Sequence, residues 1–139
     1  MNIYKFSDIY EGLEESFEVT ITDEMMDKFL DISGDINPLH IDVEYAKKKG
    51  FKDRVVYGLL SSSFYSTLAG VYLPGKFCIL QAVDIQFSKP VFVGDKLKIS
   101  GKVKYINESY KQLEIKATIT NQDNQKVSKA TIKTGLIDE

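Results

Sequence analysis

The chain has 139 residues, a net charge of −2 and an apolar content of 43%. This length accommodates one domain with a substantial core, and we expect residues 1–139 to form a single domain. Arg54 is the only arginine. Because nucleic-acid-binding faces are normally basic and rich in arginine, the composition argues against such a partner.

Neither a metal site nor a membrane segment is expected. Cys78 is the only cysteine, so an internal disulfide is excluded, and no Cys/His cluster has zinc spacing. Residues 1–10 lack the apolar core of a signal peptide, which favours a cytoplasmic location. The uncharged stretch 55–75 contains several serines and tyrosines, which makes it too polar for a lipid-facing helix.

The first third of the chain predicts a strand followed by a short helix. Apolar and polar residues alternate from Glu15 to Ile21, which is the period of a strand. Thr22 is a good helix N-cap and Gly34 a good helix terminator. The apolar face expected for this helix consists of Met25, Met26, Phe29, Leu30 and Ile32.

Two more helices are predicted after an irregular segment at 34–40. Pro38 disfavours helical backbone at Asn37, so the chain is expected to turn there. Asp42 then caps a helix over 43–49, closed by Gly50. Apolar residues recur at helical spacing in the uncharged stretch, which predicts a largely buried helix over 58–72.

The remaining sequence predicts strands. They are expected at 79–87, 96–105 and 113–119, with a last strand around Ala130 and Ile132 after a turn at 121–125. The inward face expected for the second of these carries Leu97, Ile99, Gly101, Val103 and Tyr105, opposite a row of lysines. The fold class is therefore α+β, an antiparallel sheet wrapped around the uncharged helix, which is the hot-dog architecture.

Asp35 and His40 are the residues best suited to acid–base chemistry. They lie five positions apart, with Gly34 and Pro38 favouring a turn that can bring both side chains to one place. His40 is the only histidine, and its imidazole can exchange a proton near neutral pH. A carboxylate beside it can orient a water molecule. On spacing alone, the alternative is that both residues are structural.

Several motifs resemble those of the MaoC-like dehydratases, and within that group the (R)-specific enoyl-CoA hydratases. The most specific is the string Ser33–Asp42 followed by Tyr45-Ala46; weaker matches follow in order at Val55–Leu60, Leu73-Pro74-Gly75 and Pro90–Asp95. Together they span approximately residues 20–103.

This resemblance implies a hot-dog fold, commonly a homodimer, that converts trans-2-enoyl thioesters to (R)-3-hydroxyacyl thioesters without a cofactor. The family's catalytic aspartate and histidine fall on Asp35 and His40. Its serine on the central helix falls on Ser66. The glycine whose backbone N–H receives the thioester carbonyl falls on Gly58, at the expected start of that helix.

The sequence departs from the family at Tyr57, where histidine is usual. We expect Tyr57 and Asn37 to lie at the substrate site, although Asn37 can also serve only the turn. Arg54 and the lysines at 47–49 can either meet carrier phosphates or simply face solvent. The choice between coenzyme A and acyl carrier protein stays open, as do two other functions: a thioesterase, or a non-catalytic protein that binds acyl thioesters.

Overall fold

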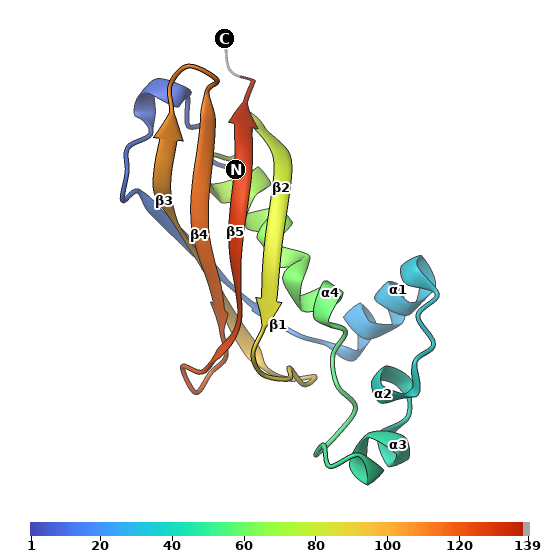
Figure 1. Ribbon diagram of the computed structural model, residues 1–139. Coiled ribbons are helices and arrows are strands. Elements are labelled where there is room, and N and C mark those ends of the chain that lie inside the picture. The colour runs from blue at the N-terminus through green and yellow to red at the C-terminus, as the bar shows by residue number, and fades with distance from the viewer. Residues whose placement is uncertain (138–139) are drawn as a thin grey trace.

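The computed structural model describes residues 1–137 and shows a five-stranded antiparallel sheet curved along a helix (Figure 1). The strands are β1 (Glu14–Thr20), β2 (Cys78–Phe87), β3 (Lys96–Asn107), β4 (Gln112–Thr120) and β5 (Lys126–Leu136). Their order in the sheet is β1-β3-β4-β5-β2. The predicted α+β class and hot-dog architecture are confirmed.

The helices form two groups. One is a nearly continuous run along the sheet: α4 (Gly58–Ser62), α5 (Phe64–Thr67) and the π-helical turn η2 (Leu68–Tyr72). The other projects beyond the end of the sheet in Figure 1: α1 (Asp23–Ser33), α2 (Pro38–Ile41) and α3 (Val43–Lys48). A short 3-10 turn, η1 (Phe6–Asp8), precedes β1. Within residues 1–137, no helix is long and apolar enough to cross a membrane.

Local capping sets the helix boundaries as the sequence predicts. Thr22 accepts a hydrogen bond from the Met25 N–H at 3.2 Å, and Gly34 ends α1 with a left-handed φ of 67°. Asp42 caps α3 in the same way, accepting from the Tyr45 N–H at 3.2 Å. One expectation for α1 is wrong: Ile32 is 84% exposed, because it falls outside the helical stripe of the buried Met26.

The core lies between the sheet and the central helix. Leu68 of η2 is fully buried against the inner face of β3, where a Cβ added to Gly101 would come within 2.8 Å of Leu68 Cδ2. A register shift after Val103 then turns Tyr105 outward, leaving it 53% exposed. The predicted inward position of Tyr105 is therefore wrong, because a bulge breaks the alternation.

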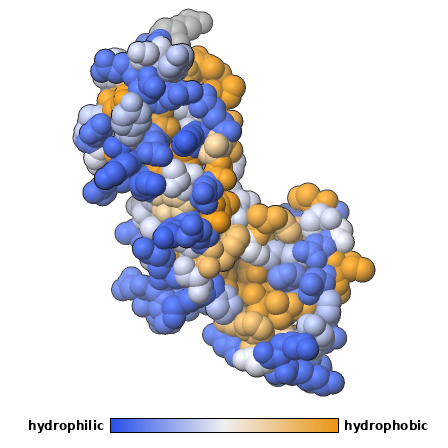
Figure 2. Space-filling model, in the orientation of Figure 1, coloured by the Kyte–Doolittle hydropathy of each residue, from blue (hydrophilic) through white to orange (hydrophobic). Residues whose placement is uncertain are grey.

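The strand order leaves β2 at an edge of the sheet. Hairpin spacing predicted only neighbours in sequence, but β2 pairs with β5 and the chain then crosses to β3. Val83 lies opposite the buried Ile132 on the inner face, yet it is 37% exposed; Leu80 and Phe87 are 46% and 53% exposed. The central helix therefore leaves part of the inner face of β2 uncovered, although Cys78 and Ile85 on that face pack against the core. Figure 2 shows apolar surface along this side and in the notch beside the projecting helices.

Candidate functional site

Asp35, the candidate acidic residue, lies directly after the end of α1. The left-handed backbone of Gly34 ends the helix, and the Asp35 N–H donates to Ser33 Oγ at 3.1 Å. The Asp35 carboxylate accepts from the Asn37 N–H at 3.1 Å through Oδ1. Asp35 is exposed, so its other carboxylate oxygen is open to solvent or substrate.

Asn37 and Pro38 convert the predicted irregular segment into a helical turn. Asn37 Oδ1 accepts from the Leu39 N–H at 2.9 Å, and Pro38 occupies the first turn of α2. Proline is favoured there because its missing N–H would have no helical partner. His40 thus lies in a short helix, which corrects the expectation of irregular backbone throughout 34–40. The structure gives Asn37 a role in this turn.

The imidazole of His40 is held by the extended segment that precedes α4. Its Nδ1 lies 2.7 Å from the Val55 carbonyl oxygen, and the Val55 N–H donates to the Leu39 carbonyl at 3.0 Å. Because a carbonyl can only accept, Nδ1 carries the proton in this bond. In the neutral ring, Nε2 then keeps its lone pair, as a base or a water acceptor requires.

Tyr57 joins the two candidate residues. Its hydroxyl donates to the Asp35 backbone carbonyl at 2.9 Å, and its ring stacks on the His40 ring with centroids 4.3 Å apart. On another side it packs against Phe29 of α1 at 4.8 Å. Burial and the nearby Asp35 raise the pKa of Tyr57, against an opposing effect of Arg54, so the hydroxyl stays protonated and can donate.

The structure thus brings Asp35, Asn37, His40 and Tyr57 into one cluster. Within residues 1–137, no hydrogen bond joins the Asp35 and His40 side chains directly. The sequence motif predicted this grouping. It gave no signal for the Val55 carbonyl, because any residue type supplies one, and Phe29 looked only like a core residue.

Gly58 opens α4 directly after Tyr57. As the first helical residue, its N–H has no partner within the helix. A Cβ at this position would come within 3.1 Å of the Phe87 ring, so the backbone approaches Phe87 closely. Gly58 also borders a mostly apolar groove of about 320 Å³, whose lining includes Phe51 and Val91 but not Asp35 or His40.

Ser66 lies further along the central helix, in α5, and is exposed. Its N–H donates to the Ser63 carbonyl at 3.0 Å. Leu59, Ser63 and Ser66 recur at helical spacing, and all three are exposed. Within a single chain, Ser66 is not in contact with Asp35 or His40. The exposed stripe of Leu59, Ser63 and Ser66 lies on the central helix, beside the open side of β2.

Two of the basic residues considered for carrier phosphates, Arg54 and Lys49, have partners nearby. Arg54 forms an ion pair with Asp23 at the start of α1 and is mostly buried. The Lys49 ammonium lies 5.4 Å from the centre of the Tyr45 ring. Neither contact favours a phosphate site. Among residues 1–137, no group of three or more His, Cys, Asp or Glu side chains could hold a metal ion.

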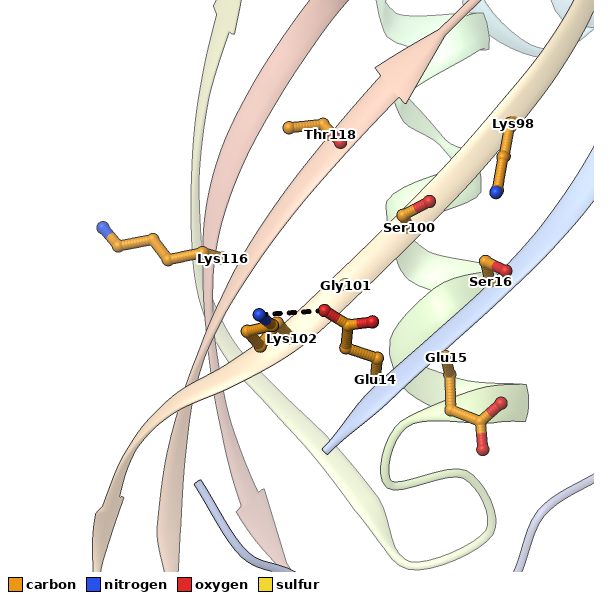
Figure 3. A pocket seen from close by; sticks show the side chains of 9 residues that line it. All are labelled: Glu14, Glu15, Ser16, Lys98, Ser100, Gly101, Lys102, Lys116 and Thr118. Atoms are coloured by element: carbon orange, nitrogen blue, oxygen red, sulfur yellow. Dashed lines mark ion pairs between the residues drawn. The ribbon is translucent and has the colours of Figure 1, made fainter. Parts of the chain in front are cut away.

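A larger polar hollow of about 550 Å³ lies on the outer face of the sheet (Figure 3). Ser16, Ser100 and Thr118 form a row of hydroxyls across β1, β3 and β4. Beside them, Lys102 is paired with Glu14 at 2.9 Å. Hydroxyls and ion pairs of this kind are typical of the solvated face of an antiparallel sheet. No candidate site residue lines the hollow.

Comparison with known proteins decides the family. The family model described as "MaoC like domain" matches residues 6–127. The chain belongs to the MaoC-like domain family. An (R)-specific enoyl-CoA hydratase of Rhodospirillum rubrum is 32% identical over 118 residues, which cover 85% of this chain and 82% of the relative. A mitochondrial 3-hydroxyacyl-[acyl-carrier-protein] dehydratase of Arabidopsis thaliana is 38% identical over 69 residues, 50% of this MaoC-like chain and 40% of the relative.

Solved structures agree on the fold. An unliganded R-hydratase of Pseudomonas aeruginosa superposes with a TM-score of 0.90 at 26% identity, covering 96% of this chain and 86% of that chain. An (R)-hydratase of Aeromonas caviae involved in PHA biosynthesis gives a TM-score of 0.88 at 27% identity, covering 92% and 97%. The MaoC-like chain thus resembles them over nearly its whole length.

Proposed function

We propose that this MaoC-like protein catalyses the reversible hydration of trans-2-enoyl thioesters to (R)-3-hydroxyacyl thioesters. The observation that supports the proposal is the cluster around Tyr57, whose hydroxyl bonds to the Asp35 backbone carbonyl and whose ring stacks on His40. The named hydratase and dehydratase relatives support the reaction class. We also keep, as proposals, a single domain and a cytoplasmic location.

The chemistry needs one water molecule held between Asp35 and His40. In the hydration direction, the water oxygen forms a bond to C3 as one of the two groups takes a water proton. A proton is delivered to C2, so the double bond is consumed and no further reactant is needed. We assign the base to Asp35, with the lone pair of His40 Nε2 orienting the water and assisting proton transfer.

Charge develops on the thioester oxygen as water adds, and we propose that the Gly58 N–H stabilises this charge. Its N–H lies at the start of α4, where donors are unpaired and the helix dipole favours negative charge. We propose that the thioester carbonyl binds there. We include Ser66 in the proposed site. Because Ser66 is exposed in the single chain, we propose that a second chain encloses the site.

The second chain is expected to cover β2. Three inner-face residues of this edge strand, Leu80, Val83 and Phe87, remain exposed, as do Leu59 and Ser66 on the helix. Exposed apolar edges are aggregation hazards that native proteins cover, and a twofold partner is the simplest cover. We therefore propose a homodimer in which this open side is buried.

The test is an assay of the purified protein with crotonyl-CoA and with the crotonyl thioester of acyl carrier protein. Loss of the conjugated enoyl absorbance and chiral analysis of the product report hydration and its stereochemistry. The relative rates on the two thioesters identify the carrier. An (R)-3-hydroxy product supports the proposal.

Two other outcomes would favour the alternatives. Release of free thiol without hydration indicates a thioesterase on the same fold. Tight binding of both thioesters without turnover indicates a non-catalytic binding protein. An (S)-product contradicts the proposed stereochemistry even if hydration is fast.

A further inference from the structure

Tyr57 has little surface and no free hydroxyl proton available for contact with a substrate. It is 2% exposed, and its hydroxyl is already engaged with the Asp35 carbonyl at 2.9 Å. Its ring is enclosed by Phe29 on one side and His40 on another. A side chain that is almost fully buried and whose hydroxyl proton is already donated is suited to holding its neighbours rather than to binding a ligand.

Among residues 1–137, the other hydrogen bonds of Asp35 are all local. Residues 34–38 are all exposed, and the Asp35 hydrogen bonds to Ser33 and Asn37 stay within the turn itself. The Tyr57 hydroxyl is the bond that ties this turn to the extended segment before α4, 22 residues further along the chain. Without it, the turn and its carboxylate can move relative to His40.

The His40 side depends on the tyrosine ring. The bond from Nδ1 to the Val55 carbonyl sets which nitrogen is protonated, but one hydrogen bond leaves the ring free to rotate about it. The Tyr57 ring, inclined by 29° to the imidazole at 4.3 Å, restricts that rotation. Nε2 is thereby directed away from Val55.

We infer that Tyr57 is a positioning residue for the acid–base pair: its hydroxyl fixes Asp35, and its ring fixes His40. The assignment rests on the proposed hydratase function and replaces the expectation that Tyr57 contacts substrate.

Two substitutions separate the two contacts. Tyr57→Phe keeps the ring and removes only the hydroxyl, so the turn loosens while His40 stays stacked. Tyr57→Leu removes both. We expect kcat for crotonyl-CoA hydration to fall about 10- to 100-fold in the phenylalanine variant and further in the leucine variant, since small misplacements of reacting groups have effects of this size. KM should stay within about threefold of the native value.

The matched control is Tyr110→Phe, which removes a hydroxyl from a tyrosine that is 75% exposed in the β3–β4 turn. It should leave both kinetic constants unchanged. Circular dichroism and urea unfolding confirm that each variant is folded before its rates are compared.

A second readout does not require activity. His40 is the only histidine, so ¹⁵N-histidine labelling gives one imidazole signal pair without assignment. At a pH at which the imidazole is neutral, the native protein and Tyr57→Phe should both carry the proton on Nδ1 and leave Nε2 unprotonated. Folded Tyr57→Leu should show averaged shifts of a mixed tautomer population, because the ring is no longer held.

The outcomes distinguish the two proposals. If the native protein does not hydrate enoyl thioesters, the proposed function fails, and the imidazole spectra still test the positioning role. If Tyr57→Phe raises KM while kcat is unchanged, Tyr57 binds substrate and the inference is overturned. An unchanged imidazole spectrum in folded Tyr57→Leu would equally overturn the claim for the ring.

Discussion

At the scale of single residues, the proposed chemistry depends on a neutral Tyr57 phenol and on reactive atoms of Asp35 and His40 that have no protein partner among residues 1–137. Asp35 is exposed and oriented by one N–H, while His40 presents Nε2 because the Val55 carbonyl occupies Nδ1. The phenol between them is neutral because burial disfavours its charged form. Each group is thus placed by an interaction that leaves its reactive atom free.

Cys78, at the start of β2, is partly buried against the core, and the reactivity of its thiol tests this packing. Burial raises the pKa of the Cys78 thiol to about 11. Because only the thiolate reacts, its fraction at pH 8 is roughly one in a thousand. We expect Ellman's reagent at pH 8 to modify the native protein about 100-fold more slowly than the urea-unfolded chain. Equal rates in the two states would contradict this packing of Cys78 against the core.

At the scale of elements, helix boundaries were predictable and strand neighbours were not. Caps such as Thr22 and Asp42 act within a few residues, so the sequence reveals them directly. Pairing of β2 with β5 joins residues about 50 positions apart, and no local pattern encodes it. The bulge that turns Tyr105 outward depends equally on a partner strand.

The same distinction applies to the candidate site. The turn from Gly34 to Pro38 was predictable because glycine and proline act locally on the backbone. The bond from His40 to the Val55 carbonyl and the one from Tyr57 to Asp35 were not, since they join separate segments through groups with no sequence signature. Sequence therefore indicated which residues meet, and the structure adds what holds them.

The close contact between β3 and the central helix gives a stability prediction. Gly101→Val would place side-chain atoms where Leu68 and Ile115 now pack, within about 3 Å of a new Cβ. We expect the free energy of unfolding to fall by about 1–3 kcal/mol, measured by urea denaturation. Gly70→Ala in η2 is the control, because a Cβ there meets nothing within 4 Å. A Gly101→Val protein as stable as the native one would contradict this packing.

At the scale of the whole molecule, a single chain leaves Asp35, Ser66 and part of the inner face of β2 open to solvent. The open inner face of β2 and the exposed stripe of the helix are the surfaces expected to be buried in the proposed homodimer. An enoyl thioester would then react in a region shielded from bulk water, where hydrogen bonds to developing charge are stronger.

Val83→Lys tests this assembly. A charged ammonium on the inner face of β2 should resist burial in the interface, so we expect the native protein to be dimeric and this variant monomeric in light scattering at micromolar concentration. Gln86→Lys puts the same charge on the outer face of the same strand and should stay dimeric. A monomeric native protein, or a dimeric Val83→Lys variant, would argue against β2 as the interface.

Asp35 and His40 are the two groups proposed to perform the acid–base chemistry of hydration. The most direct measurement is the initial rate of crotonyl-CoA hydration by the native protein, Asp35→Asn and His40→Gln, with matching circular dichroism spectra to show an unchanged fold. We predict (R)-specific turnover by the native protein and a loss of about 10²–10⁴-fold in each variant. Near-native rates in either variant would contradict the assignment and transfer the chemistry to other residues.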